Sequence, residues 1–231
     1  MALVGPFSSF YDNFSKKLQY IRHYVIITKV FSNLYIITGG YNMSDGIHQT
    51  FIVAVVGMCG AGKSVFTNYF IDAGWPSIYF GGVTMEILEQ KKLPKIQIHE
   101  KEVRESLRAE HGMEAFAKIL YPRIDKVAKT QNVILDGLYS WAEYKYLKDK
   151  FGSRLIIIAI ITDRQKRYQR LTTRPLRPLT LEEAALRDYY EIENLDKGGP
   201  IAIADYYVYN NELLEDLELK YHSFCDWLKN K

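Results

Sequence analysis

The segment that most constrains this chain is the octapeptide Gly57 to Ser64, GMCGAGKS, because of what flanks it. The residues just before it, Phe51 to Val56, are all apolar and mostly β-branched, as expected for a parallel strand buried on both faces. After it, apolar residues recur with the spacing of one helical face from Phe66 to Ala73. A strand, a glycine-rich turn and a helix in this order predict a parallel α/β unit.

The octapeptide satisfies the pattern GxxxxGK[ST] in the context that this pattern requires. Glycines allow close backbone approach, so that successive N–H groups surround phosphate oxygens at the positive end of a helix dipole. We expect Lys63 to neutralise the β- and γ-phosphates and the Ser64 hydroxyl to bind Mg²⁺. The residues expected to hold the nucleotide in this segment are Gly57, Gly60, Ala61, Gly62, Lys63, Ser64 and Val65.

The rest of the chain alternates short apolar strands with amphipathic helices. Further strands are predicted at residues 77–80, 133–135, 155–161 and 206–209. Helices are predicted at about 83–90, 99–110, 114–128, 142–150, 164–173, 181–194 and 212–229. This alternation predicts an α/β three-layer sandwich with a parallel five-stranded sheet.

Length and charge bound the possible functions. A chain of 231 residues suits one domain with an additional segment. The net charge of +3 comes from the residues before Met43, where four basic residues outnumber one acidic residue, so the rest of the chain is neutral overall. A general nucleic-acid binder would carry a basic excess over its folded surface, and we therefore expect no nucleic-acid partner.

The N-terminal segment is predicted to be separate from the functional fold. Its apolar stretch from Tyr24 to Gly40 is interrupted by polar residues and is too short for a membrane helix. It also lacks the uninterrupted apolar region of a signal peptide. We expect no membrane partner, and we interpret residues 1–42 as an N-terminal extension and residues 43–231 as a P-loop kinase domain.

The cysteines argue for a reducing compartment. Cys59 and Cys225 are the two cysteines of the chain, and they are far apart in sequence, so neither a disulfide framework nor a zinc cluster is expected. A cytoplasmic protein fits this composition. We expect a monomer or a homodimer.

An arginine-rich segment follows the fourth predicted strand. Arg167, Arg170 and Arg174 have the i, i+3 and i+7 spacing of one helical face, which could clamp phosphates. A proline at 175 then breaks the helix, and Arg187 lies in the next one. This layout predicts a mobile lid at about residues 174–187, whose guanidinium groups stabilise the charge of a transferred phosphoryl group.

Three further motifs resemble those of P-loop nucleotide kinases. Residues 170–174, RLTTR, resemble the motif at the start of the lid of adenylate-kinase-type enzymes. Residues 204–210, ADYYVYN, are similar to the last strand and following loop of dephospho-CoA kinases, and residues 133–137, VILDG, resemble a strand end shared by both families. The resemblance covers about residues 51–229. It is closest to a poorly characterised prokaryotic group of dephospho-CoA-kinase-like, predicted nucleotide kinases.

The resemblance implies a nucleoside-monophosphate-kinase-like fold with a short lid. It also implies phosphoryl transfer from ATP, with Mg²⁺, to a small nucleotide-type acceptor, either dephospho-CoA or a nucleoside monophosphate. By position, Asp136 would hold the hydration shell of Mg²⁺ or orient the acceptor hydroxyl. Arg170 and Arg174 would contact the adenine and phosphates of ATP. Arg187 would approach the transferred group, and the loop at Asn210 would border the adenine.

Two departures from the family patterns leave the acceptor open. No acidic residue occurs in Tyr79 to Thr84, where dephospho-CoA kinases carry a candidate base, and residues 138–140 read LYS where adenylate kinases have Phe-Pro-Arg. An ATP-binding regulatory module without kinase turnover is therefore the alternative function. A guanine-specific switch is disfavoured because the chain has no Asn-Lys-x-Asp element. Candidates for the acceptor side are Thr84, Arg104, Arg108 and Arg123.

Overall fold

The computed structural model describes residues 49–231 of the chain. The expected N-terminal extension at residues 1–42, and the expected start of the kinase domain at residue 43, lie outside the described residues. Within residues 49–231, every helix is too short or too polar to span a lipid bilayer.

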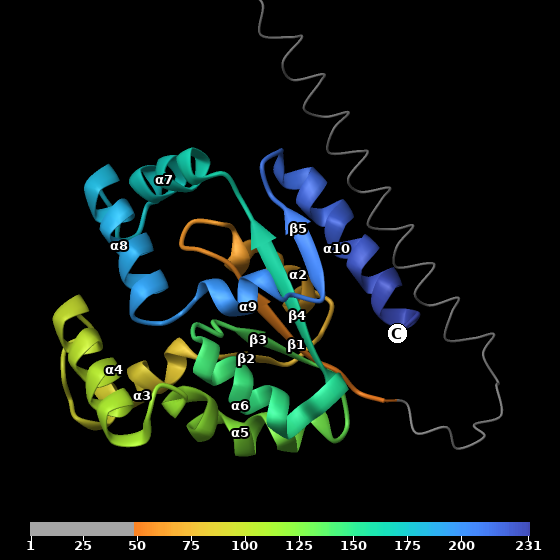
Figure 1. Cartoon of the computed structure of the whole chain (residues 1–231), viewed down its shortest axis with the longest axis horizontal. Helices are drawn as coiled ribbons and strands as arrows, with labels where there is room; N and C mark the ends of the chain where they lie inside the picture. Colours follow the sequence, from red (N-terminus) through yellow and green to blue (C-terminus); the bar gives the residue numbers. More distant parts are fainter. Residues whose placement is uncertain (1–48) are drawn as a thin grey trace, which may run out of the picture. The chain divides into compact units, whose positions relative to one another are not determined.

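Five parallel strands form one sheet at the centre of this part of the chain (Figure 1). They are β1 (Ile52–Val56), β2 (Ser77–Tyr79), β3 (Val133–Asp136), β4 (Leu155–Ile161) and β5 (Tyr206–Tyr209). Their order across the sheet is β2-β3-β1-β4-β5, and every neighbouring pair is parallel. The predicted five-stranded parallel sheet is confirmed.

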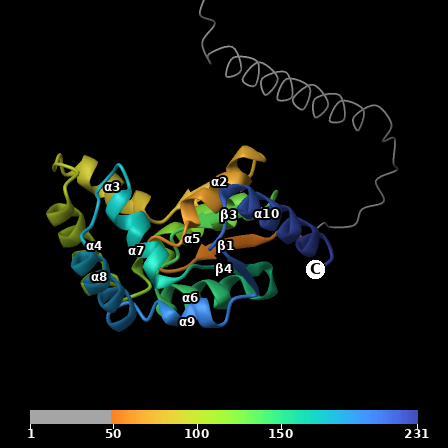
Figure 2. The same ribbon diagram turned by 90° about the horizontal axis from the view of Figure 1, so that it is seen from above.

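Helices connect the strands and cover both faces of the sheet. They are α2 (Lys63–Asp72), α3 (Gly81–Gln90), α4 (Gln97–His111), α5 (Ala115–Ala128), α6 (Trp141–Phe151), α7 (Arg164–Thr173), α8 (Leu181–Glu193), α9 (Gly198–Ala202) and α10 (Leu214–Lys229), with a 3₁₀ turn η1 (Gly152–Arg154). Figure 2 shows α2 and α10 on one face of the sheet and α6 and α9 on the other. The structure thus has the three layers that the sequence predicts, and it adds α9, which is too short to show a periodic pattern.

The two faces of β1 bury alternate residues in two separate cores. Ile52, Ala54 and Val56 pack in the core under α5 and α6, whereas Val53 and Val55 pack in the core under α2 and α10. All five residues are buried. Because successive side chains of a strand point to opposite faces, a strand covered on both faces needs an unbroken apolar run.

Aromatic side chains fix α2 against α10. Phe70 of α2 meets Tyr221 and Phe224 of α10 edge to face, with ring centroids 4.9 and 5.7 Å apart. Phe66 and Phe70 are fully buried, and burial of one such side chain contributes about 1.5–3 kcal/mol. This packing holds the first turn of α2, and with it the end of the glycine-rich loop, at the carboxyl edge of the sheet.

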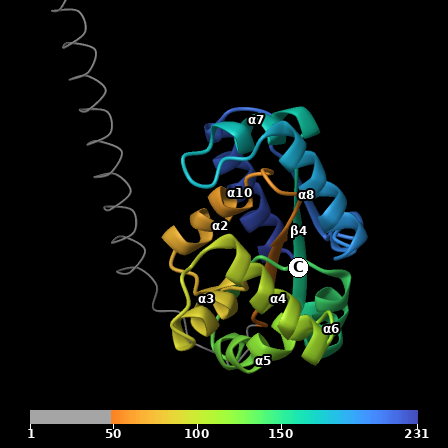
Figure 3. The ribbon, with the colours of Figure 1, turned by 90° about the vertical axis from the view of Figure 1, so that its left-hand side faces the viewer.

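The carboxyl ends of the strands meet at one edge because the strands are parallel. Figure 3 shows two groups of helices around the sheet. One group is α7 and α8, and the other is α3 and α4. Ligands of open parallel sheets bind outside this carboxyl edge.

Candidate functional site

The glycine-rich loop after β1 adopts a backbone that only glycine allows. Gly57 and Gly62 have φ angles of 144° and 98°. A Cβ atom at Gly57 would lie 2.5 Å from the carbonyl oxygen of Ile160, and one at Gly62 would collide with the side-chain amide of Asn210. These positions therefore tolerate no side chain, and the loop backbone stays close to β4 and to the loop after β5.

Lys63 begins α2 and folds back over the loop. Its Nζ donates hydrogen bonds to the carbonyl oxygens of Gly57, at 2.8 Å, and Met58, at 3.1 Å. Burial lowers the pKa of Lys63 to about 8, and the charge of Lys197 lowers it as well, whereas Glu191 and Asp136 raise it. Since its present acceptors are neutral carbonyls, this cation can exchange them for an anion.

The first turn of α2 leaves two predicted residues open to solvent. Ser64 and Val65 are exposed. The carbonyl oxygen of Ala61 accepts hydrogen bonds from Asn210 Nδ2, at 2.8 Å, and from Thr162 Oγ1, at 3.0 Å. Thr162, which follows β4, and Asn210, which follows β5, thus hold the glycine-rich loop in place.

Asp136 is the last residue of β3, which places it next to β1. Its backbone pairs in register with Val55 of β1 and with Tyr79 of β2. Burial raises the pKa of Asp136, and the charge of Lys63 opposes this shift. The carboxylate of Asp136, the ammonium group of Lys63 and the backbone of the glycine-rich loop therefore lie together at one edge of the sheet.

The side-chain oxygens of Ser64 and Asp136 suit a magnesium ion whose other ligands come from a bound phosphate and water. Ser64 and Asp136 offer a hydroxyl and a carboxylate, the donor types that Mg²⁺ prefers. Among residues 49–231, no group of three or more histidine, cysteine or acidic residues could hold a metal by itself. A magnesium ion here would depend on phosphate oxygens and waters for its remaining ligands, as is usual for this ion.

Arg167 has a different position from the one its spacing indicates. It is buried, and both of its terminal nitrogens bind the carboxylate of Asp188 on α8, at 2.9 and 2.6 Å. Nη1 also donates to the carbonyl oxygen of Cys59, at 3.0 Å. Cys59 packs against Leu171 and Ala184. Arg167 therefore ties α7 and α8 to the glycine-rich loop.

Arg174 does not share the helical face that its spacing predicts. The helix α7 ends at Thr173, and Arg174 is extended, with φ −63° and ψ 142°. The cause is Pro175, because proline disfavours helical geometry in the residue before it. Nε of Arg174 donates instead to the carbonyl oxygen of Arg177, at 2.6 Å, so the prediction of one arginine face is wrong at this position.

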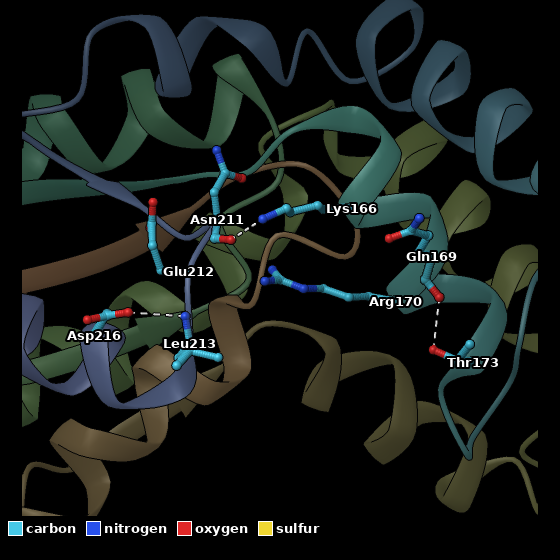
Figure 4. A pocket seen from close by; sticks show the side chains of 8 residues that line it. All are labelled: Lys166, Gln169, Arg170, Thr173, Asn211, Glu212, Leu213 and Asp216. Atoms are coloured by element: carbon cyan, nitrogen blue, oxygen red, sulfur yellow. Dashed lines mark hydrogen bonds between the residues drawn. The ribbon is translucent and has the colours of Figure 1, made fainter.

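Arg170 contacts the loop after β5, which contains Asn210. Nη2 of Arg170 donates to the carbonyl oxygen of Asn210, at 3.0 Å. Beside them lies an open pocket of about 630 Å³, shown in Figure 4, where Lys166 also donates to the carbonyl oxygen of Asn211. The pocket is lined by Lys166, Gln169, Arg170, Thr173, Asn211, Glu212, Leu213 and Asp216.

Arg187 belongs to a charged cluster that sequence reasoning missed. Its Nε donates to Glu191 Oε1, at 3.2 Å, and the other oxygen of Glu191 accepts from Lys197 Nζ, at 2.6 Å. Burial opposes the charge of Arg187, but Cys59 and Glu191 raise its pKa overall. Lys197 directly precedes α9, in the sequence DKGG, where no periodic pattern distinguishes a buried lysine from a loop residue.

The acceptor-side candidates are spread over three helices. Thr84 is buried on α3, and its hydroxyl has no hydrogen-bonding partner among residues 49–231. Arg104 and Arg108 lie on α4, with Arg104 at 3.5 Å from Glu100. Arg123 is exposed on α5. The structure thus brings Thr84, Arg104 and Arg108 to the α3 and α4 side and leaves Arg123 on the surface of α5.

Comparison with known proteins agrees with this fold. The family model described as AAA domain matches residues 53–188. A UPF0200 protein of Thermococcus sibiricus is 32% identical over 181 residues, which cover 77% of this chain and 95% of that protein. A UPF0200 protein of Aeropyrum pernix is 35% identical over 171 residues, which cover 73% of this chain and 89% of that protein.

Solved structures show the same fold. Shikimate kinase from Bacteroides thetaiotaomicron matches with a TM-score of 0.52 and 16% identity, over 78% of this chain and 98% of that one. Shikimate kinase from Acinetobacter baumannii, in complex with shikimate, matches with a TM-score of 0.52 and 22% identity, over 79% of this chain and 95% of that one. The α/β class and the resemblance to a poorly characterised group of P-loop kinase-like proteins are confirmed.

Proposed function

The chain belongs to the UPF0200 family and has a P-loop kinase-like fold, and from its site we propose that it transfers the γ-phosphoryl group of ATP to a small acceptor. The acceptor is of the nucleotide type, either dephospho-CoA or a nucleoside monophosphate. The observation that carries the proposal is the meeting of the glycine-rich loop, the cation Lys63 and the carboxylate Asp136 at one edge of the sheet. Positioning and charge stabilisation are what phosphoryl transfer requires of a protein.

ATP is proposed to bind with its phosphates in the glycine-rich loop and its adenine beside Arg170. Main-chain N–H groups from Gly60 to Val65 surround the β-phosphate, and Lys63 exchanges its carbonyl acceptors for phosphate oxygens. The pocket next to Asn210 accommodates the base, with Arg170 at its wall.

The acceptor hydroxyl is proposed to approach Asp136. Burial raises the pKa of this carboxyl group, and the nearby charge of Lys63 opposes the rise and favours the ionised form, which can accept a hydrogen bond from the hydroxyl. Ser64 and Asp136 together would hold magnesium, which supplies neutralising charge on the phosphate oxygens when bound. Asp136 then orients the hydroxyl toward the phosphate end of the loop.

Two arginines are proposed to stabilise the transferred group. Arg174 and Arg187 are each held through Nε, by the carbonyl of Arg177 and by the carboxylate of Glu191. This leaves the terminal nitrogens of both guanidinium groups as donors for the charge that develops on the phosphoryl oxygens. We propose residues 174–187 as a lid over this group and residues 43–231 as the kinase domain.

One observation favours the alternative of an ATP-binding regulatory module without turnover. The residues from the end of β2 to Thr84 include no acidic side chain that could serve as a base for the acceptor. In that case the loop and Lys63 would hold ATP in the same way, and the protein would act through a partner.

An assay of ADP release with the full chain tests the proposal. ATP and Mg²⁺ are combined with each nucleoside monophosphate and with dephospho-CoA, and we expect turnover that depends on one of these acceptors. Lys63→Ala should abolish turnover and keep the thermal unfolding profile of the wild type. Lys148→Ala is the matched control, because Lys148 donates to the carbonyl of Leu155 at the opposite edge of the sheet. Tight ATP binding without stimulation by any acceptor would instead favour the regulatory module.

A further inference from the structure

One face of α8 lies against the glycine-rich loop. Ala184, Arg187, Asp188 and Glu191 follow the i, i+3, i+4 and i+7 spacing of this face. Ala184 packs against Cys59 of the loop, and Asp188 is joined to the carbonyl of Cys59 through the buried arginine of α7. Arg187 lies between these two anchors, so α8 presents it to the loop.

Glu191 is shared by two cations on different segments. Glu191 is 5% exposed, and its two carboxylate oxygens accept separately from Arg187 Nε and from Lys197 Nζ. Lys197 is 2% exposed, and its Nζ also lies 5.2 Å from the centre of the Tyr139 ring. Among residues 49–231, the two terminal nitrogens of Arg187 have no hydrogen-bonding partner.

The segment that carries Lys197 is anchored to the start of α6. The carbonyl oxygen of Leu195 accepts from the backbone N–H of Trp141, at 3.2 Å. A Cβ atom at Gly199 would lie 2.7 Å from the Trp141 ring, so glycine is needed for this close approach. Only four residues separate Trp141 from Asp136 at the end of β3, so this anchor holds the Lys197 segment near the edge of the sheet where the glycine-rich loop begins.

The chemistry of an arginine beside a carboxylate explains what Lys197 does. A carboxylate with both oxygens free binds arginine through two parallel hydrogen bonds, which occupies two of its nitrogens. The two oxygens of Glu191 are divided between Lys197 Nζ and Arg187 Nε, so removal of Lys197 would leave the first oxygen to a terminal nitrogen of Arg187. A buried glutamate without Lys197 would also carry an uncompensated negative charge next to the site for phosphate.

We propose that Lys197 and Glu191 are positioning residues that hold Arg187 with both terminal nitrogens free for the transferred phosphoryl group. The inference rests on the proposed function and adds to it two residues outside every recognised motif. The electrostatic effect of both residues on Lys63 supports their nearness to the phosphate site.

Calorimetric titration of the full chain with ADP and with the non-hydrolysable ATP analogue AMP-PNP, each with Mg²⁺, tests the inference. Arg187→Met is expected to weaken AMP-PNP binding about tenfold and to change ADP binding less than about twofold. Lys197→Met should have the same effect. The double variant should bind AMP-PNP no more weakly than either single variant, because Lys197 acts through Arg187. Lys148→Met is the matched control and should change neither affinity.

A second variant provides the test in case Lys197→Met does not fold. Lys197→Met combined with Glu191→Gln removes the buried charge as well as its partner, and the neutral amide cannot hold Arg187 by two charge-assisted bonds. This variant should bind AMP-PNP within about threefold of the wild type. If Lys197→Met does not fold, this variant decides, and a loss of about tenfold would overturn the inference.

The outcomes separate the inference from the proposed function. The inference is overturned if Lys197→Met keeps the wild-type affinity for AMP-PNP, if it weakens ADP and AMP-PNP equally, or if its effect adds to that of Arg187→Met. A wild-type chain that binds neither nucleotide would contradict the proposed function itself.

Discussion

Arg177, in the connection between α7 and α8, donates two hydrogen bonds to the carboxylate of Glu100 on α4, at 2.6 and 3.1 Å. The Glu100 side chain is 5% exposed, whereas that of Arg177 is 62% exposed. The proposed lid is thereby tied to the α3 and α4 side of the site by one ion pair.

Arg177→Ala should release this tie and speed the association of ATP a few-fold. Because Arg177 is largely exposed and Arg104 remains 3.5 Å from Glu100, we expect the free energy of unfolding to change by no more than about 1 kcal/mol. Stopped-flow binding of a fluorescent ATP analogue and urea unfolding measure the two effects. Arg123→Ala, which removes an exposed pair with Glu86, is the control. An association rate equal to that of the wild type would show that the pair does not restrain the lid.

The lowered pKa of Lys63 predicts a pH dependence of ATP binding. Burial brings this pKa to about 8, so in the free protein the lysine loses its charge as the pH rises through this value. Since the charged form binds phosphate, the affinity for AMP-PNP should be constant below about pH 7 and then fall about tenfold per pH unit well above pH 8. Titrations with AMP-PNP from below pH 7 to pH 9.5 test this prediction. Lys63→Arg should abolish the fall in affinity, because arginine stays charged. An affinity that does not change up to pH 9.5 would contradict the assignment of Lys63.

Arg174→Ala should lower turnover more than ATP affinity. The reason is that a guanidinium group that stabilises developing charge acts chiefly in the transition state. We expect kcat to fall about 10²-fold and the KM for ATP to change less than about threefold. Steady-state kinetics with the acceptor found in the panel provides the measurement, and a wild-type kcat would refute a catalytic role for Arg174.

Arg167 and Arg170, one helical turn apart, should differ in the consequences of their removal. Arg167→Ala leaves the buried carboxylate of Asp188 with the hydroxyl of Tyr168 but without its cation, and we expect a loss of about 3 kcal/mol in the free energy of unfolding. Arg170→Ala removes a single contact to the Asn210 carbonyl and should weaken ATP binding while changing stability by about 1 kcal/mol or less. Urea unfolding and ATP titration of both variants compare the two roles. Equal stability losses would contradict this division.

Glu143 predicts a pH dependence of stability. It caps α6 by accepting from the backbone N–H groups of Tyr139 and Ser140, and burial raises its pKa to about 7. The folded state therefore holds a proton that the unfolded state releases near pH 4.5. The resulting stabilisation, about 3 kcal/mol, is complete below pH 4.5 and is lost as the pH rises through 7.

Glu143→Gln should remove most of this dependence, because the amide does not titrate and can still accept from the same N–H groups. Urea unfolding at pH 5 and pH 8 gives the comparison. A difference between the two pH values as large in the variant as in the wild type would assign the effect to other groups.

The local part of the fold was predictable from the residues alone. The bounds of β4, β5 and α7 agree with those expected, because β4 is a long apolar run, β5 is a short apolar run between Asp205 and Asn210, and α7 ends just before a proline. The glycine-rich loop was also predictable from local sequence, because glycines at fixed spacing determine its backbone conformation. The short α9 was missed because five residues cannot show a period.

The different positions and partners of the charged residues depend on contacts between distant segments of the chain. Spacing alone placed Arg167, Arg170 and Arg174 on one helical face, whereas the structure buries Arg167 against Asp188 and turns Arg174 out of the helix before Pro175. Lys197 carries no local signal, and its burial against Glu191 follows only from the packing of its segment on α6.

The sequence by itself therefore determined the phosphate loop, the identity of the strands and the presence of an arginine-rich segment, since backbone sterics and hydrophobic periodicity act over a few neighbouring residues. Tertiary structure alone decided the strand order, the partner of each arginine and the cluster around Glu191. The physical reason is that an ion pair depends on the distance between two groups in space, and residues far apart in the chain come within that distance only when the core packs.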